Sequence, residues 1–210
     1  FAAPREAVAG GMRGIAKPGV PCVVGDPDPA IVAMLVAAGT TAVQRSDPTA
    51  TLPVIVVPSE ARWEGPLGLL GPHQRRNAAV AQAALTALPS AFRVPAEAMA
   101  EAFSRTRVAG RLDRRGRWLF DVAHNPDGMR SLTSALAELR LPGPVHGLVS
   151  ILGDKAWPAM LVELDRALDV GILTVAPSAD TRRWDLGWLE RWLADPERPA
   201  ARARWRLIPD

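Results

Sequence analysis

The residues best suited to chemistry follow an apolar run that ends at Phe120. The next letters read Asp-Val-Ala-His-Asn-Pro, so Asp121 and His124 stand three positions apart, and Asn125 and Pro126 follow them. In an open α/β sheet, ligands bind beyond the carboxyl ends of strands; a carboxylate, an imidazole and the free N–H groups of a helix start suit a ribose or a polyphosphate. The same letters are ordinary turn chemistry, with Asn125 capping a helix and Pro126 at its first position. Taken alone, the segment supports a ligand site and an ordinary turn equally well.

A second polar cluster follows a glycine-rich stretch. His73, Gln74 and Asn77 come directly after Gly71 and Pro72, and an alanine-rich run follows them. Asn77 is a good cap for a helix over residues 77–88, and that role alone would explain it. By itself the cluster is weak evidence for a site.

The elements that must position these residues alternate along the chain. In the second half, the pattern predicts strands at 118–122, 145–152 and 170–176 and helices at 127–139, 156–168 and 186–194. In the first half, it predicts strands at 20–25 and 52–57 and helices at 29–39, 77–88 and 96–104. Strands alternating with helices of this length are typical of a parallel, doubly wound sheet. The best domain boundary lies near residues 105–109, and no closing strand is predicted after residue 194.

Composition narrows the function classes. The chain has 210 residues, a formal net charge of +3 and 48% hydrophobic residues, which suits one large or two small domains. Cys22 is the single cysteine, so a disulfide framework or a cysteine zinc site is excluded. The arginine-rich stretches 111–117 and 198–206 are expected to be solvated faces rather than a nucleic-acid surface. A single cysteine fits a reducing cytoplasm, and no apolar run approaches a membrane span, so we expect a soluble, cytoplasmic protein.

Three tryptophans add a packing prediction. Trp184, Trp188 and Trp192 recur every four residues. This spacing predicts one stripe on a helix, used for core or domain-interface packing rather than for a ligand cage.

Taken together, four ordered motifs resemble a known family. Residues 71–79 read Gly-x-His-Gln-x-x-Asn-Ala-Ala, 109–112 read Ala-Gly-Arg-Leu, 119–126 read Leu-Phe-Asp-Val-Ala-His-Asn-Pro, and 153–155 read Gly-Asp-Lys. In this order, and with the Gly-Ile-Ala-Lys-Pro-Gly-Val-Pro of residues 14–21, they resemble the folylpolyglutamate synthase and dihydrofolate synthase family, relatives of the Mur ligases. The implied fold class is α/β: the later part of a P-loop ligase central domain over residues 1–106, then a Rossmann-like Mur ligase carboxy-terminal domain over 107–210, which looks truncated.

The resemblance implies an ATP-dependent ligase that adds L-glutamate to dihydropteroate or a tetrahydrofolate through an acyl phosphate, with ATP and Mg²⁺ and as a monomer. It implies a nucleotide cleft formed by Asn77, Arg111, Asp121 and His124, with Asp121 on the ribose and His124 near the phosphates. The supporting residues it implies are His73, Gln74, Asn125 and Lys155. For Lys155, with Asp154 before it, a surface loop or salt bridge is favoured over a catalytic role. No catalytic residue or metal ligand is assigned.

Two departures from the family pattern matter as much. The P-loop, Gly-x-x-Gly-Lys-Ser/Thr, does not occur in this sequence. Where the family has Glu-Lys-Ala, beside its second magnesium, this chain has Gly11, Met12 and Arg13, and neither a glycine nor a methionine side chain binds a hard cation. We therefore expect an incomplete ligase chain that is inactive by itself. A Mur-type amino-acid ligase and a non-catalytic nucleotide-binding relative remain as alternatives, and the motifs leave open whether the parent protein is active.

Overall fold

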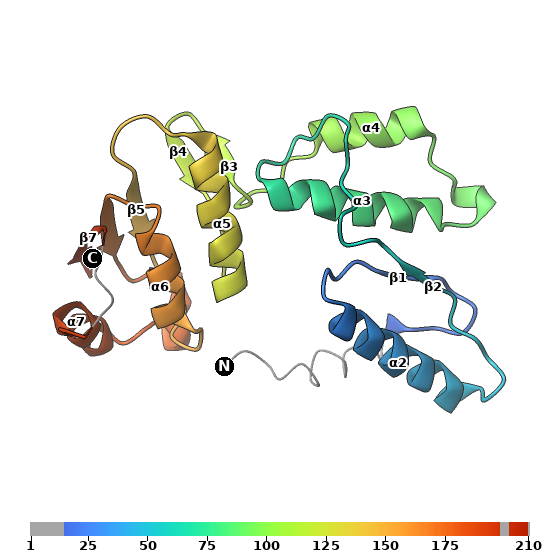
Figure 1. Ribbon diagram of the computed structural model, residues 1–210. Helices are drawn as coiled ribbons and strands as arrows, with labels where there is room; N and C mark the ends of the chain where they lie inside the picture. The colour runs from blue at the N-terminus through green and yellow to red at the C-terminus, as the bar shows by residue number, and fades with distance from the viewer. Residues whose placement is uncertain (1–14, 198–201, 210) are drawn as a thin grey trace. The chain divides into compact units, whose positions relative to one another are not determined.

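The computed structural model describes residues 15–197 and 202–209. The chain divides into two compact units between Val108 and Ala109 (Figure 1). The first unit runs to Val108 and the second unit starts at Ala109. Gly11, Met12 and Arg13 lie outside the described residues.

The described residues of the first unit combine a small parallel sheet with the α-helices α2, α3 and α4. Its elements are β1 (Cys22–Val24), α2 (Pro29–Ser46), β2 (Val54–Val56), α3 (Pro72–Thr86), the 3-10 helix η1 (Ser90–Phe92) and α4 (Ala96–Arg105). β1 and β2 pair in parallel, with Val23 opposite Ile55. α2 starts where the Asp28 side chain accepts the Ala30 N–H at 2.8 Å, and it continues past the predicted end at residue 39.

α3 begins five residues earlier than the sequence predicted. Gly71 has a φ of +97° and turns the chain, and Pro72, with its fixed φ, takes the first helical position. Asn77 therefore lies inside the helix, and the prediction that it caps the helix is wrong. His73 and Gln74 belong to the first turn of α3.

The second unit opens with a hairpin rather than with the predicted parallel strand. β3 (Asp113–Arg115) and β4 (Trp118–Phe120) pair antiparallel, with Arg114 opposite Leu119. Only Gly116 and Arg117 connect them, and Gly116 has a φ of +62°. A two-residue connection with a left-handed glycine directs the chain into a hairpin, so residues 118–122 lie in a local antiparallel pair.

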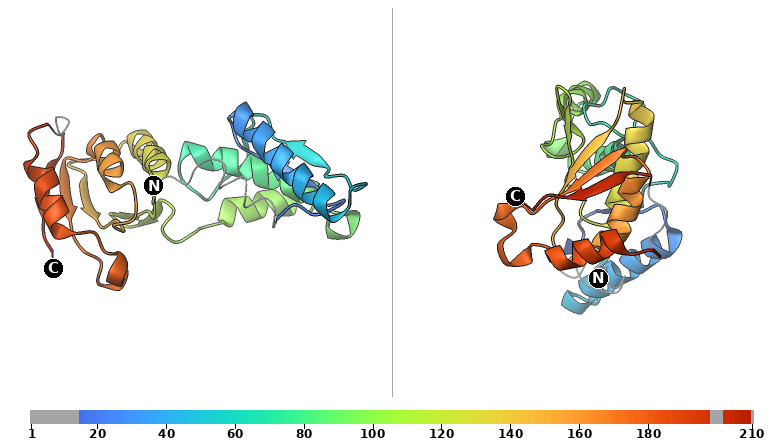
Figure 2. Two further views of the ribbon diagram at one scale, coloured as in Figure 1. Left: turned by 90° about the horizontal axis from the view of Figure 1, so that it is seen from below. Right: turned by 90° about the vertical axis from the view of Figure 1, so that its left-hand side faces the viewer.

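The rest of the second unit is a three-stranded parallel sheet with helices. β5 (His146–Val149), β6 (Val170–Leu173) and β7 (Arg204–Leu207) pair in that order, side by side in the right view of Figure 2. The helices are α5 (Pro126–Leu139), α6 (Trp157–Asp165), α7 (Leu186–Ala194) and the 3-10 segment η2 (Pro177–Arg182).

β7 was missed by the sequence analysis, which expected a solvated basic face there. The strand alternates: Trp205 and Leu207 pack against the core, while Arg204 and Arg206 are exposed. Gly171 on β6 leaves room for the Trp205 ring, because a Cβ at this position would collide with it. Tertiary packing of every second side chain makes this segment a strand.

The core of the second unit lies around α6. Met160, Leu161, Leu173 and Leu189 are fully buried there. Within the described part of the chain, no helix is both long and apolar enough to cross a membrane.

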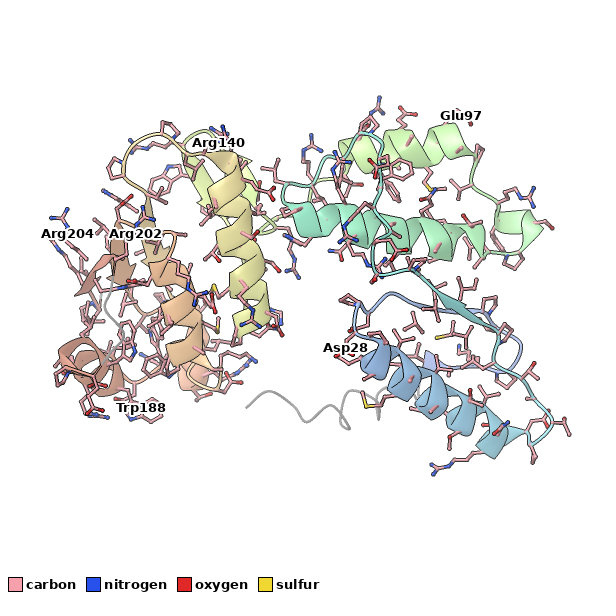
Figure 3. All side chains as sticks on the ribbon, viewed as in Figure 1. Asp28, Glu97, Arg140, Trp188, Arg202 and Arg204 are labelled. Atoms are coloured by element: carbon pink, nitrogen blue, oxygen red, sulfur yellow. The ribbon has the colours of Figure 1, made fainter. Side chains whose placement is uncertain are left out.

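The tryptophans do not form the single stripe that their spacing predicted. Trp184 precedes α7 and is 1% exposed, and its Nε1 donates to the Thr174 carbonyl at 2.9 Å. Trp188 is 49% exposed and lies at the edge of the unit (Figure 3). Trp192 is half-buried and meets the rings of Trp157 and Trp205 edge-on. Because Asp185 caps the helix and α7 starts only at Leu186, Trp184 leaves the stripe.

Candidate functional site

Asp121 joins the two ends of the β3–β4 hairpin. Its Oδ2 accepts the backbone N–H of Leu112 at 3.0 Å, and its Oδ1 accepts that of Ala123 at 2.8 Å. Leu112 is 2% exposed and has a φ of +47°, a left-handed conformation that an ordinary side chain rarely adopts. The carboxylate is thus fixed in direction, and each oxygen keeps a further lone pair for a ligand hydroxyl.

The Gly-Arg-Leu motif is bound to the Asp-x-x-His motif in the fold. Val122 donates its N–H to the Gly110 carbonyl at 2.9 Å. Gly110 has a φ of +72°, and a Cβ there would collide with Val122. Arg111, between Gly110 and Leu112, is exposed and makes no hydrogen bond or ion pair among the described residues. The motif therefore presents one available cation beside a fixed carboxylate.

His124 and Asn125 come after Asp121 in the chain, and their side chains lie in different environments. His124 is exposed, and its Nδ1 lies 3.3 Å from the Val122 carbonyl. Asn125 caps α5: its side chain accepts the Gly128 N–H at 2.7 Å, and Pro126 takes the first helical position, as the sequence predicted. The Asn125 side chain thus shapes the helix start, while the imidazole is open to solvent.

In the first unit, the second cluster forms a chain of hydrogen bonds along α3. The Asn77 amide donates to Gln74 Oε1 at 3.1 Å, and the Gln74 amide nitrogen lies 3.0 Å from His73 Nε2. Because an amide nitrogen only donates, His73 Nε2 is the acceptor in this arrangement. Gln74 is 7% exposed, whereas Asn77 is exposed. We call these three residues the amide chain; it offers the Asn77 carboxamide to a ligand.

The neighbouring Arg76 was not singled out from the sequence. Its guanidinium donates to three backbone carbonyls, those of Gly25, Val57 and Pro58. The sequence offered one sign of its role: Arg75 and Arg76 stand side by side just before an alanine-rich run. The amide chain belongs to the first unit and Asp121 to the second.

Lys155 lies in an ion-pair network on the surface of the second unit. Its Nζ is 3.5 Å from Asp154 Oδ2, and Arg182 Nη2 is 2.8 Å from the same oxygen. The Arg182 hydrogen bond holds the pKa of the Asp154 carboxyl below its ordinary value. This arrangement gives Lys155 a structural partner.

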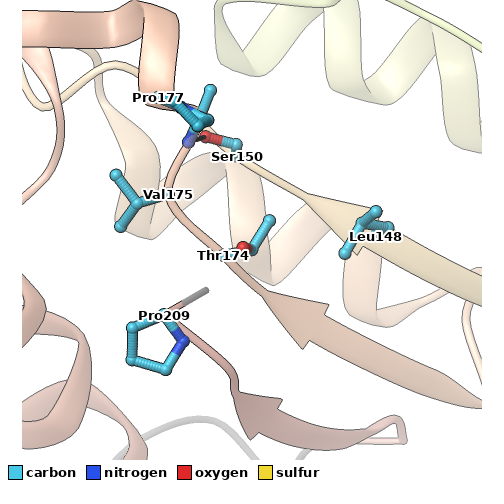
Figure 4. Close-up of a pocket in the computed structure, with 7 residues that line it drawn as sticks. Leu148, Ser150, Thr174, Val175, Pro177 and Pro209 are labelled. Atoms are coloured by element: carbon cyan, nitrogen blue, oxygen red, sulfur yellow. Dashed lines mark hydrogen bonds between the residues drawn. The ribbon is translucent and has the colours of Figure 1, made fainter.

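An open hollow of about 650 Å³ lies at the carboxyl ends of β5 and β6 (Figure 4). It is lined by Leu148, Ser150, Thr174, Val175, Ala176, Pro177 and Pro209. Ser150 Oγ accepts the Ala176 N–H at 3.0 Å and so ties the two strand ends together. These residues were missed because the predicted strands, 145–152 and 170–176, ran past the observed strand ends at Val149 and Leu173 and so included most of them. The hollow lies at the sheet edge where α/β folds hold ligands.

The described residues provide no cluster of metal-binding side chains. Within residues 15–197 and 202–209, no group of three or more His, Cys, Asp or Glu side chains is arranged to hold a metal ion. Mg²⁺ is usually held by one or two carboxylates together with waters and substrate phosphates, and the described residues provide no preformed protein cage for it.

No family model matches this sequence, and no curated protein matches it significantly. Solved structures do. Over 100% of the chain it is similar to Mycobacterium tuberculosis folylpolyglutamate synthase complexed with ADP, with a TM-score of 0.77 and 26% identity, covering 50% of that protein. It is also similar to E. coli FolC in complex with DHPP and ADP, with a TM-score of 0.71 and 21% identity over 99% of this chain and 49% of that one.

A third similar structure is the bifunctional folylpolyglutamate synthase/dihydrofolate synthase of Yersinia pestis, complexed with AMPPNP and a Mn ion. It has a TM-score of 0.71 and 22% identity over 100% of this chain and 49% of that one. The chain thus spans about half the length of the proteins it resembles. With its mixed helices and small parallel sheets it has the fold of folylpolyglutamate synthases, including that of their carboxy-terminal domain, and the resemblance that the motifs predicted is confirmed.

Proposed function

We propose that this chain is the later part of an ATP-dependent ligase of folate metabolism, which adds L-glutamate to dihydropteroate or a tetrahydrofolate through an acyl phosphate. Residues 1–106 would belong to the central ATPase domain and 107–210 to the Mur ligase-like carboxy-terminal domain. The observation that supports this most is the similarity of the whole chain to a folylpolyglutamate synthase complexed with ADP, at a TM-score of 0.77. The order of the four motifs supports it independently.

In this proposal the second unit contributes a carboxylate, an imidazole and a guanidinium to the nucleotide. Asp121 is held by two backbone N–H groups and uses its remaining lone pairs for the ribose hydroxyls. His124 and Arg111 are exposed and supply positive charge or hydrogen bonds to the phosphates. The start of α5, capped by Asn125, adds N–H groups that favour an anion.

The first unit contributes the Asn77 carboxamide. Gln74 is buried and holds Asn77 by a hydrogen bond, and His73 holds Gln74 in turn. His73 and Gln74 therefore support the contact rather than make it. Both amides are fixed before a ligand arrives, which lowers the entropy cost of binding.

Phosphoryl transfer depends mainly on positioning and on neutralising charge at the phosphates. The backbone cradle of a P-loop is not in this sequence, and the described residues offer no cluster of three or more metal-binding side chains. We expect this chain to bind the ribose side of the nucleotide weakly and to transfer no phosphoryl group unless a P-loop half is supplied.

The test is a calorimetric titration of the chain with ADP and with Mg-ATP. Asp121→Ala and His124→Ala should each weaken binding, because each removes a proposed contact to the nucleotide. His146→Ala is the matched control: His146 is exposed on β5, outside the proposed site, and its loss should leave affinity unchanged. Equal affinity of wild type and both site variants would contradict the proposal.

Met12, which stands where the family has its lysine, favours a second candidate, a nucleotide-binding relative without catalysis. A coding sequence upstream that contains Gly-x-x-Gly-Lys-Ser would support the ligase. A start codon near Phe1 would support the non-catalytic relative. A Mur-type ligase acting on a UDP-linked precursor is the other alternative, and nucleotide-dependent glutamate addition to dihydropteroate by the completed protein would exclude it.

A further inference from the structure

Arg76 holds the carboxyl ends of two strands against the start of α3. Its Nη1 donates to the Pro58 carbonyl at 2.5 Å, and its Nη2 donates to the Gly25 carbonyl at 3.0 Å and to the Val57 carbonyl at 2.9 Å. Gly25 directly follows β1, and Val57 and Pro58 directly follow β2. One side chain therefore ties together three segments that lie up to 51 residues apart.

A side chain of α3 also packs closely against this strand edge. A Cβ on Gly25 would collide with the side chain of Val80 on α3. Val57 itself is buried and donates its N–H to the Val24 carbonyl at 2.9 Å. The Arg76 contacts thus fall at a packed junction, where a small rotation of the helix would break several interactions together.

The preceding Arg75 fixes the same helix turn from another side. Its Nη1 donates to the Trp63 carbonyl at 2.6 Å, and the Trp63 N–H donates to the Arg75 carbonyl at 2.9 Å. The Trp63 ring meets Phe103 of α4 edge-on, with centroids 5.0 Å apart. The start of α3 is therefore held on two sides.

The half-buried Arg76 guanidinium is bound by backbone carbonyls rather than by a carboxylate. Among the described residues its guanidinium has no carboxylate partner, and its Nε is buried without a hydrogen bond. Removing a cation from water without an opposite charge costs stability. A planar guanidinium spreads its donors over two nitrogens and so reaches carbonyls on both strand ends; a lysine ammonium, whose three donors sit on one nitrogen, reproduces this geometry only in part.

We propose that Arg76 is a positioning residue for the nucleotide contact made by α3. Successive residues of an α-helix point about 100° apart, so fixing Arg76 against the strand ends fixes the direction in which Asn77 points. The uncompensated positive charge also favours an anionic ligand at this strand edge. This inference rests on the proposed function, because the amide chain is the proposed nucleotide contact of the first unit.

The test compares Arg76→Gln and Arg76→Lys with Arg93→Gln in the full chain. Arg93 is exposed in the same unit, so Arg93→Gln makes the same change of charge away from the junction. Two measurements are made on each variant. The NMR signals of the Gln74 and Asn77 side-chain amides report the amide chain without nucleotide, and an ADP titration reports binding.

We expect Arg76→Gln to shift or broaden both amide signals and to weaken ADP binding by about tenfold or more, because three charge-assisted hydrogen bonds are lost. Arg76→Lys should show a smaller change in both measurements, and Arg93→Gln should match wild type. A thermal unfolding curve for each variant identifies any that fails to fold. If Arg76→Gln fails to fold, Arg76→Lys, which keeps the charge, is compared with wild type instead.

Unchanged amide signals in a folded Arg76→Gln protein would overturn the inference. Changed signals with unchanged ADP affinity would also overturn it, since Arg76 would then be structural only. If wild type binds no ADP, the proposed function fails for this chain, and the amide signals alone still decide whether Arg76 sets the geometry of the amide chain.

Discussion

The carboxylate of Asp121 accepts the backbone N–H of Leu112 at 3.0 Å, across nine positions of the sequence. Leu112 is buried and has a left-handed backbone, so this hydrogen bond satisfies an N–H that water cannot reach. Two motifs that look independent in the sequence are in this way one structural element. The bond also fixes the carboxylate that the proposed site uses.

Replacing Asp121 should destabilise the second unit. Asp121→Ala leaves the Leu112 and Ala123 N–H groups without their acceptor and should lower the free energy of unfolding by about 1–3 kcal/mol. Asp121→Asn, whose amide oxygen keeps one acceptor, should lose less. Urea unfolding followed by tryptophan fluorescence measures this, since every tryptophan except Trp63 lies in the second unit. Equal stability of the alanine variant and wild type would show that the bond to Leu112 contributes nothing.

The helix cap at Asn125 gives a second prediction. Asn125→Ala removes the acceptor for the Gly128 N–H, and loss of such a cap typically costs about 0.5–2 kcal/mol. Asn125→Asp keeps an oxygen acceptor at the same place and should retain most of the stability. The midpoint of thermal unfolding compares the two, and an aspartate variant as unstable as the alanine variant would argue against capping.

Trp184 and Trp188 should contribute differently to stability, although their spacing in the sequence predicted the same role for both. Trp184→Ala removes a ring that is 1% exposed and should cost about 3–5 kcal/mol through lost burial and the cavity left behind. Trp188→Ala changes a ring that is 49% exposed and should have a much smaller effect. Urea unfolding of both variants, followed by far-ultraviolet circular dichroism, measures the difference. Equal losses would mean that both rings belong to one buried stripe.

Asp169 should account for part of the loss of folding stability at low pH. The Val145 N–H donates to its carboxylate at 2.7 Å, and this hydrogen bond, with the nearby Arg202, holds the pKa of Asp169 below its ordinary value of 3.8. A carboxyl with a lowered pKa in the folded state stabilises the fold above pH 3.8 and loses this contribution as the pH falls through the folded pKa.

Asp169→Asn should therefore be less stable than wild type near neutral pH and should lose less stability below pH 3.8. Urea unfolding at a series of pH values measures both effects. Because a backbone hydrogen bond is the main cause, the difference should persist at high salt, where exposed ion pairs are screened. A difference that disappears in salt would assign the effect to Arg202 instead.

Local sequence signals were enough to predict the start of α5, the order of several elements and the family resemblance. Asn125 and Pro126 marked the start of α5 correctly, because capping and the fixed φ of proline act within a few residues. The order of the motifs was sufficient to predict a resemblance that the solved structures confirm. Alternating strands and helices gave β5, α6, β6 and α7 near their observed positions.

Tertiary structure decided the features that depend on distant partners. Residues 118–120 pair with the preceding strand β3, because a two-residue connection brings β3 beside them, and an apolar run cannot reveal its partner. β7 is a strand because Trp205 packs beside Gly171, far away in the sequence. The contacts of Arg76 with Gly25 and Val57 are of the same kind. A side chain's type states what it can bind, and only the folded chain brings the binding groups within reach.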